Sequence, residues 1–313
     1  MKVKVFIDGS SGTTGLRIAD RLAERPEIEL LSISAEGRKD VHERAKVINS
    51  ADLAFLCLPD AASKEVMPLL RPDVKVLDTS TAFRTDAAWD YGFPELKGQK
   101  AKIQNSYRVA VPGCYASGFI SIARPLVELG LAPKDYPFSC TGISGYSGGG
   151  KKMIAEYESA DRPAHSKLDA PKSYGLGLAH KHLPEMQKIS GLAHTPMFVP
   201  VVCDYYCGMQ VLVPLDLTLA GSTAEQVAEG IAAYYKDAAT VKVHALNEAL
   251  PENGLYSNAM AGTDRMELYM TVNAEGDQMM LVSVFDNLGK GSSGAAVQCM
   301  NLMLGLEETE GLE

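Results

Sequence analysis

Hydrophobic and polar positions in the first 110 or so residues alternate between a strand pattern and a helix pattern. Short runs rich in β-branched and aromatic residues predict buried strands at residues 3–8, 28–33, 53–58, 74–77 and 103–111. Segments of about ten residues with helical spacing of apolar side chains separate most of these runs. This alternation indicates right-handed βαβ units around a parallel sheet. We therefore predict a doubly wound α/β domain of the Rossmann, nucleotide-binding type.

The pattern changes from about residue 134 onward. Strand-like runs become longer, at residues 137–143 and 197–219, and residues 266–272 and 279–285 predict a hairpin. This part of the chain therefore predicts an α+β domain with an antiparallel or mixed sheet.

Two helices stand out in the second half of the sequence. Ser222 and Glu225 have the spacing of a capping box, which predicts a helix start. Residues 294–304 predict one more apolar helix. We expect this last helix to pack back on the first domain.

The composition is that of a globular protein, because 46% of the 313 residues are apolar and 22% are charged. No apolar run reaches the roughly 18 residues of a membrane helix, and the start of the sequence has no apolar leader block. The net charge of −9 disfavours binding to nucleic acid or to anionic membranes. We therefore expect a cytoplasmic protein that acts on small molecules.

The six cysteines are too sparse for a disulfide framework, and no C-x-x-C pair indicates structural zinc. We expect Cys57, Cys140 and Cys299 to be small packed side chains. Cys203 and Cys207 lie in an apolar run without a histidine, so we predict no metal site.

Cys114 differs from the other cysteines, because it follows Pro112-Gly113 between a predicted strand and an apolar helical run. A thiol at a helix start lies at the positive end of the helix dipole, which lowers the thiol pKa. Gly113 also leaves room for a substrate to approach. We therefore predict that Cys114 is a nucleophile.

A thiolate nucleophile usually works with an acid–base partner. His180 and His182 lie with a lysine and a carboxylate in the stretch Leu178-Ala-His-Lys-His-Leu-Pro-Glu185. We favour His182 as the acid–base group and keep His180 in reserve. An ordinary helix surface is the alternative, and a metal pair is disfavoured because no third ligand is evident.

Two glycine-rich turns are candidates for binding anions. Gly9, Gly12 and Gly15 follow the first predicted strand and open a helix, an arrangement that suits a dinucleotide pyrophosphate although the spacing is G-x-x-G-x-x-G. The second turn, Ser147-Gly148-Gly-Gly-Lys151, precedes a helical segment and combines backbone N–H groups with lysine charge. We predict that it holds a substrate carboxylate or phosphate.

The end of the second predicted strand bears on the choice of cofactor. Ser34 and Arg38 suit the 2′-phosphate of NADP, whereas Glu36 would suit the ribose diol of NAD. We favour NADP(H).

Several segments, in order along the chain, resemble the N-acetyl-γ-glutamyl-phosphate reductases of arginine biosynthesis, in the shorter of their two sequence types. They are Gly9 to Gly15, Leu77-Asp-Thr-Ser80-Thr-Ala-Phe-Arg84, Tyr91-Gly-Phe-Pro-Glu95-Leu, Pro112-Gly-Cys114-Tyr, Ser147 to Lys151, His180-Lys-His182-Leu-Pro-Glu185 and Asp286-Asn287-Leu-Gly-Lys290-Gly-Ser-Ser-Gly-Ala-Ala-Val-Gln298. The resemblance implies a phosphorylating aldehyde dehydrogenase that uses NADPH and a cysteine thioester. It also implies a nucleotide-binding domain of residues 1–113 plus 288–313 and a catalytic, oligomerisation domain of residues 114–287.

The resemblance also implies roles for particular positions. Cys114 matches the nucleophile, His182 the acid–base group, and Glu185 a residue that orients it. The pyrophosphate turn matches Gly9, Ser11, Gly12, Thr13 and Gly15, and the stretch near the nicotinamide includes Asn287 and Gly289. Arg84 and Lys151 match basic positions for phosphate or the substrate carboxylate.

The function expected from the resemblance is NADPH-dependent reduction of N-acetylglutamyl 5-phosphate to the 5-semialdehyde and phosphate. Two alternatives stay open: an enzyme like the related aspartate-semialdehyde dehydrogenases acting on another acyl phosphate, and a non-catalytic NADP-binding regulator. Relatives are dimers or tetramers, so we expect a homo-oligomer.

Overall fold

The computed structural model describes residues 2–313, which divide into two compact units. The first unit runs through Pro94 and also contains residues 98–113 and 292–312. The second unit contains residues 95–97, 114–291 and 313. The boundary near the C-terminus lies after Gly291, whereas the sequence analysis placed it after residue 287. Within residues 2–313, no helix has both the length and the hydropathy needed to cross a membrane.

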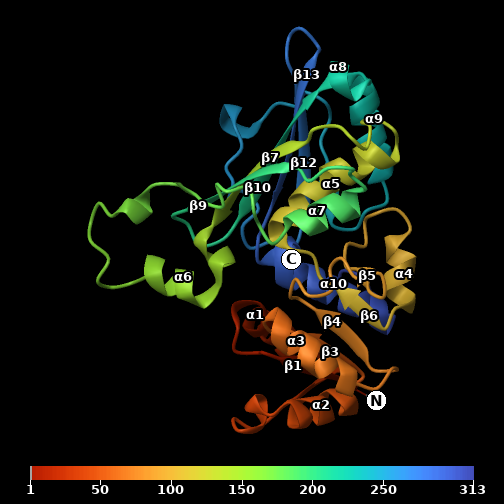
Figure 1. The fold of residues 1–313 in the computed structure, drawn as a ribbon, viewed down its shortest axis with the longest axis vertical. Coiled ribbons are helices and arrows are strands. Elements are labelled where there is room, and N and C mark those ends of the chain that lie inside the picture. The colour runs from red at the N-terminus through yellow and green to blue at the C-terminus, as the bar shows by residue number, and fades with distance from the viewer. Residues whose placement is uncertain (1) are drawn as a thin grey trace. The chain divides into compact units, whose positions relative to one another are not determined.

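The first unit is built on a parallel sheet with the strand order β2-β1-β3-β4-β6-β5 (Figure 1). Its strands are β1 (Val3–Asp8), β2 (Ile28–Leu31), β3 (Leu53–Leu56), β4 (Lys75–Asp78), β5 (Asp90–Tyr91) and β6 (Arg108–Ala110). Its α-helices are α1 (Thr13–Ala23), α2 (Val41–Ser50), α3 (Asp60–Val66), α4 (Gln99–Asn105) and α10 (Gly294–Leu304). The predicted doubly wound α/β fold is confirmed.

Both faces of this sheet are covered because side chains alternate along each strand. Val5 and Ile7 of β1 pack in one cluster with Ile18 of α1 and with the apolar side of α10. Phe6 points to the opposite face and packs with Ile48 of α2. The prediction that the C-terminal helix packs on the first domain is therefore confirmed.

The second unit is built on a mixed sheet with the order β11-β12-β13-β10-β7-β9-β8. Its strands are β7 (Ser139–Gly145), β8 (Lys172–Ser173), β9 (Met197–Cys203), β10 (Met209–Asp216), β11 (Val241–Val243), β12 (Met266–Val272) and β13 (Gln278–Phe285). Its α-helices are α5 (Cys114–Glu128), α6 (Gly150–Tyr157), α7 (Leu183–Ser190), α8 (Leu217–Ala220) and α9 (Ala224–Tyr234). The predicted hairpin is β12 and β13, which pair antiparallel.

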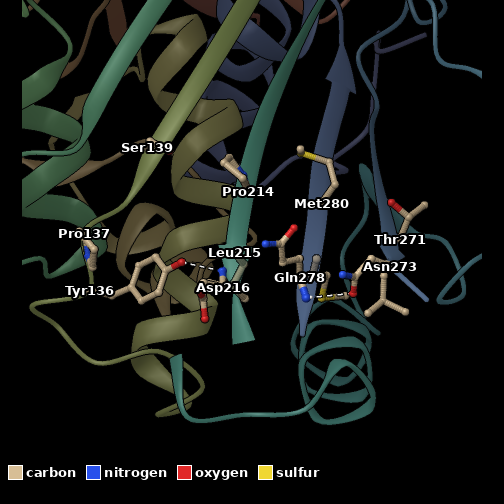
Figure 2. A pocket seen from close by; sticks show the side chains of 12 residues that line it. Tyr136, Pro137, Ser139, Pro214, Leu215, Asp216, Thr271, Asn273, Gln278 and Met280 are labelled. Atoms are coloured by element: carbon tan, nitrogen blue, oxygen red, sulfur yellow. Dashed lines mark hydrogen bonds between the residues drawn. The ribbon is translucent and has the colours of Figure 1, made fainter. Parts of the chain in front are cut away.

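Helices cover one face of this second sheet. Helix α5 packs on β10 and β13, and α7 and α9 pack on α5 (Figure 1). The other face carries half-buried or exposed side chains such as Leu212, Pro214 and Met280. Figure 2 shows a pocket of about 540 Å³ on the sheet, lined by residues that include Pro214 and Met280, where the Asp216 N–H donates to the Tyr136 hydroxyl oxygen at 2.7 Å.

Three predictions about elements are corrected by the structure. Residues 103–111 are not one strand, because α4 continues to Asn105 and only Arg108–Ala110 joins the sheet; Ile103 is the one buried side chain of α4, as on a helix face. The capping box is Thr223 with Gln226, one residue later than predicted. Ser222 instead donates its hydroxyl to the Leu131 carbonyl at 2.8 Å.

The third correction concerns the long run of residues 197–219. It divides into β9 and β10, joined by a turn over residues 204–208, and it ends in α8. Gly208 adopts a φ of +108°, a conformation that favours glycine, and this allows the chain to turn between the two strands.

Candidate active site

Cys114 is the first residue of α5 and is half-buried. The chain reaches it from β6 through Pro112-Gly113, so the predicted placement at the start of a helix is confirmed. This position brings the thiol to the end of the helix where unsatisfied N–H groups favour negative charge.

Gly291 lies directly against Cys114, the predicted nucleophile, and the sequence analysis assigned it no role. A Cβ at Gly291 would lie 3.0 Å from the Cys114 Cβ and 3.0 Å from the Asp286 carbonyl oxygen. Its N–H donates to that same carbonyl at 2.9 Å. The Asp286 carboxylate accepts the Leu288 N–H at 2.6 Å, so Asp286 shapes the turn that carries Gly291.

Tyr115, the residue after Cys114, is in ring contact with both candidate histidines. Its ring centroid is 5.9 Å from that of His180 and 6.1 Å from that of His182. The two imidazoles are themselves 4.7 Å apart in an edge contact. The fold therefore brings the two predicted acid–base candidates to the start of α5.

The two histidines have different environments. His180 accepts a hydrogen bond from the His182 N–H at its Nδ1, so the neutral ring carries its proton on Nε2. Burial, with a smaller contribution from the Lys181 charge, lowers the pKa of His180 to about 4. His182 is 5% exposed and precedes α7, and Glu185 is buried in the first turn of that helix.

Four of the other five cysteines are poor candidates for a nucleophile. Cys140 and Cys299 are buried, as expected, but Cys57 is only half-buried. Burial raises the pKa of Cys57 to about 12 and also raises the pKa of Cys140 and Cys203. Among residues 2–313, no group of three or more His, Cys, Asp or Glu side chains could hold a metal ion.

The predicted anion-binding turn precedes α6. Ser147 is buried in a 3₁₀ turn (Tyr146–Gly149), whereas Gly148 and Lys151 are exposed. A Cβ at Gly148 would lie 3.4 Å from the Ser144 Oγ, and the Ser144 hydroxyl donates to the Gly145 carbonyl at 3.1 Å. Ser144, at the end of β7, therefore borders this turn.

Asn287 and Gly289, both predicted near the nicotinamide, are engaged by other residues of the second unit. The Asn287 Oδ1 accepts the Gly208 N–H at 2.8 Å, and its Nδ2 donates to the Ser147 Oγ at 3.0 Å. A Cβ at Gly289 would lie 2.1 Å from the Thr263 carbonyl oxygen, so close packing requires glycine there. A role for either residue at the nicotinamide stays a prediction.

The first unit contains the predicted pyrophosphate turn. Gly9 has a φ of +91°, and a Cβ there would lie 2.3 Å from the Cys57 carbonyl oxygen. A Cβ at Gly15 would lie 2.4 Å from the Gly9 carbonyl oxygen, so glycine lets α1 begin close to β1. Gly12 is the N-cap of α1 and offers no side-chain cap, which leaves N–H groups of the first turn available to an anion.

The strand order also favours a nucleotide at this turn. Strand β1 lies between β2 and β3, so the connection from β1 to β2 and the connection from β2 to β3 run in opposite directions along the sheet. Ligands of doubly wound sheets bind where the strand order reverses in this way. Ser11 is exposed and Thr13 half-buried at the same turn. After β2, the Ser34 Oγ accepts the Gly37 N–H at 3.0 Å and Arg38 is exposed.

Arg84 belongs to the first unit, whereas Ser147, Gly148 and Lys151 belong to the second. Its Nε donates to the Val111 carbonyl oxygen at 2.9 Å, and a terminal nitrogen donates to the Thr79 carbonyl oxygen at 2.9 Å. The Arg84 guanidinium therefore hydrogen bonds both to the segment that follows β4 and to the segment that follows β6.

A buried ion pair in the second unit was not predicted. The Lys290 Nζ lies 2.7 Å from a Glu95 carboxylate oxygen, and the two side chains are 2% and 1% exposed. The Thr240 hydroxyl donates to the same carboxylate. Both charged residues lie in the segments that carry the family resemblance, but the sequence contains no signal that pairs them.

Comparison with known proteins gives matches across almost the whole chain. Residues 4–104 match the family described as semialdehyde dehydrogenase, NAD binding domain, and residues 114–287 match semialdehyde dehydrogenase, dimerisation domain. Two N-acetyl-γ-glutamyl-phosphate reductases are similar in sequence. The reductase of Trichormus variabilis is 46% identical, and the match covers 99% of both chains. The reductase of Burkholderia orbicola is 47% identical, and the match covers 96% of this chain and 97% of the other. A solved structure of aspartate semialdehyde dehydrogenase with NADP from Candida albicans has a similar fold, with a TM-score of 0.64, 14% identity and coverage of 97% and 99%.

Proposed function

The chain belongs to the N-acetyl-γ-glutamyl-phosphate reductases of the semialdehyde dehydrogenase family, and we propose that it reduces N-acetylglutamyl 5-phosphate to N-acetylglutamate 5-semialdehyde and phosphate. This is an oxidoreductase reaction of arginine biosynthesis. The observation that carries the proposal is the placement of Cys114 at the start of α5, with Tyr115 in contact with both histidines.

The cofactor in this proposal is NADP(H). The glycine turn at the start of α1 would hold the pyrophosphate, and Ser34 and Arg38, at the turn after β2, would hold the 2′-phosphate. When bound, the reduced nicotinamide supplies the hydride for the reaction.

Cys114 acts as the nucleophile. Its thiolate attacks the acyl carbon, a carbon–sulfur bond forms and the carbon–oxygen bond to phosphate breaks, which leaves a thioester. After reduction, the carbon–sulfur bond of the hemithioacetal breaks, the aldehyde leaves and the sulfur is restored. The backbone N–H of Cys114 supports the oxyanion of each tetrahedral stage, and a donor of this kind contributes about 3 kcal/mol.

His182 is the acid–base group in this scheme. It gives a proton to the sulfur as the hemithioacetal oxyanion collapses to the aldehyde, and it takes the thiol proton back before the next attack. His180 suits this task less well, because a pKa of about 4 leaves it neutral near pH 7. Glu185 orients His182 from the first turn of α7.

The acyl phosphate carries two anionic groups, and basic residues are available for them. Ser147, Gly148 and Lys151 surround the start of α6 and bind one of these groups through hydroxyl, N–H and ammonium donors. Arg84 is the remaining basic candidate for binding the other anionic group.

The deciding experiment is the reverse assay: phosphate-dependent reduction of NADP with N-acetylglutamate 5-semialdehyde. Cys114→Ser should abolish turnover and leave NADPH binding intact, whereas Cys203→Ser, at another half-buried cysteine, should stay active. Near-normal turnover of Cys114→Ser would contradict the assignment. Aspartate semialdehyde and NAD are the comparison substrates, and a preference for either would redirect the proposal.

We also propose a homo-oligomer in which a second copy covers the open face of the second sheet. The support is the match of residues 114–287 to a dimerisation domain and the half-buried apolar side chains of that face, such as Leu212 and Met280. A cytoplasmic location is supported by six free cysteines, which suit a reducing compartment.

A further inference from the structure

Residues Gly289–Ser293 form a π-helical turn between β13 and α10, and the side chain of Lys290 leaves this turn to meet Glu95. We propose that Glu95 and Lys290 are positioning residues, whose buried hydrogen bond holds the turn in its π-helical register. The register in turn keeps Gly291 in place against Cys114. This inference rests on the function proposed above, because it requires Cys114 to be the nucleophile.

The first argument concerns the register of the turn. The Gly291 N–H donates to the Asp286 carbonyl at 2.9 Å, which is the five-residue spacing of a π-helix. Such turns are rare and are found mostly as single turns within α-helices, frequently at functional sites. The backbone at Ser293 already has α-helical angles, with φ −65° and ψ −37°, so α-helical bonding could extend backward from α10. The register therefore depends on contacts from outside the turn.

The second argument is that Glu95 ties the turn to the second sheet. The Lys290 Nζ donates to a Glu95 carboxylate oxygen at 2.7 Å, and the Thr240 hydroxyl donates to the same oxygen. Thr240 directly precedes β11, and its carbonyl accepts the Met266 N–H of β12 at 2.8 Å. The carboxylate therefore connects the π-helical turn to the edge of the sheet formed by β11 and β12.

The third argument is that the pair acts through position and not through contact with substrate. The two charged side chains are 2% and 1% exposed, so both are enclosed in protein. The turn presents backbone to α5, because a Cβ at Gly291 would lie 3.0 Å from the Cys114 Cβ and 3.2 Å from the Phe285 ring. The same ring lies against α5 one turn later, where a Cβ at Gly118 would be 2.9 Å from it. The start of α5 therefore has little room to shift while the turn stays in place.

A charged hydrogen bond suits this task because it specifies a distance and a direction between two groups. Apolar contacts have no preferred direction. A leucine and a methionine at the two positions would fill the space in several arrangements, so they would remove the cost of burying charge without fixing the register.

The test compares variants whose stability and activity should change in opposite directions. Glu95→Gln keeps an oxygen that accepts the Lys290 hydrogen bond but removes the compensating charge. The double variant Glu95→Leu with Lys290→Met removes both charges and the hydrogen bond. The matched control is the same double replacement at an exposed ion pair, Glu43→Leu with Lys46→Met, where the side chains are 53% and 77% exposed.

Four quantities are measured on the full chain, at a temperature at which every variant is folded. They are the urea midpoint, the kcat and KM of the reverse assay at saturating NADP, the rate at which iodoacetamide alkylates Cys114 without substrate, and hydrogen exchange of residues 289–293 relative to residues 295–304.

Glu95→Gln should lower the urea midpoint yet keep kcat and the alkylation rate within about threefold of wild type, because the hydrogen bond to Lys290 is retained. The apolar double variant should recover the urea midpoint yet lower kcat by about tenfold or more with little change in KM, because a displaced nucleophile is misaligned for attack. Its alkylation rate should also fall, because the thiol leaves the favourable end of α5, and residues 289–293 should exchange faster. The control should change none of these quantities.

Three results would overturn the proposal. The first is a kcat that follows the urea midpoint across the variants, which would show that the pair acts only through stability. The second is unchanged exchange of residues 289–293 in the apolar double variant. The third, which needs only Glu95→Gln, is fast exchange of these residues with wild-type kcat, which would separate the register from the nucleophile.

Failure of the proposed function is a separate observation. Wild type would then not reduce NADP with the semialdehyde and phosphate. The alkylation and exchange measurements need no substrate, so they would still show whether the pair positions Cys114.

Discussion

The buried pair of Lys290 and Glu95 leads to a quantitative prediction about stability. The two charges lie 2.7 Å apart and are almost fully excluded from solvent. In an effective dielectric constant of about 20, their attraction is about 6 kcal/mol, which offsets the cost of burying both. Glu95→Gln keeps the shape of the side chain but leaves the Lys290 ammonium without its carboxylate, and breaking such a pair typically costs about 3–5 kcal/mol.

Unfolding by urea and by heat would measure this effect. A loss of about 3–5 kcal/mol corresponds to a fall in Tm of about 6–20 °C for units of this size. The double variant Glu95→Leu with Lys290→Met removes both charges, so it should recover most of the loss. The control is Glu43→Gln, whose ion pair with Lys46 is 3.9 Å long with side chains 53% and 77% exposed, and its effect should stay below about 0.5 kcal/mol.

The reasoning would be refuted by either of two results. A loss below about 1 kcal/mol in Glu95→Gln would show that the ammonium finds other compensation. A double variant no more stable than Glu95→Gln would show that shape and hydrogen bonding, not charge, determine the loss.

Two further predictions concern the active site. Gly291→Ala should lower kcat by about 10²-fold with little change in NADPH affinity, because a Cβ there would lie 3.0 Å from the Cys114 Cβ and displace Cys114. The control is Gly177→Ala, where a Cβ meets nothing within 4 Å, and it should leave kcat unchanged. Equal kcat values for the two variants would contradict the packing argument. The pKa of His180 is lowered from 6.5 to about 4 in the folded protein. Between pH 6.5 and pH 4, folded His180 therefore binds fewer protons than unfolded His180, and the free energy of unfolding should fall as the pH decreases through this range. Urea midpoints at pH 7.5 and pH 5 should therefore converge in His180→Gln relative to wild type, and an identical pH dependence in both would show that His180 is not responsible.

Local patterns predicted the elements that local interactions determine. The hairpin of β12 and β13 and the bounds of α10, Gly294–Leu304, are readable because hydrophobic periodicity and turn residues are short-range signals. The errors also have local causes. Ser222 and Thr223 are neighbours that can each cap a helix, and packing decided between them when Ser222 bonded the Leu131 carbonyl.

The candidate site also has features that the sequence predicted and features that it did not. The chemistry of Cys114, His180 and His182 was visible in the sequence, because a thiol at a helix start and paired imidazoles are recognisable as residue types in context. The partners of Asn287 and the contact of Gly291 with Cys114 were not visible, because these residues lie 79 to 177 positions from the groups that they touch, as from Asn287 to Gly208 or from Gly291 to Cys114.

By itself, then, the sequence determined the fold class and the family of this protein and named its candidate reactive side chains, since each depends on residue identity and on spacing over a few turns of chain. Only the tertiary structure decided which backbone lies against Cys114, that Lys290 meets Glu95, and that the Asn287 amide is engaged by Ser147 and Gly208. The physical reason is that hydrogen bonds and van der Waals contacts act over a few ångströms. The folded chain alone brings residues that are far apart in sequence within that range.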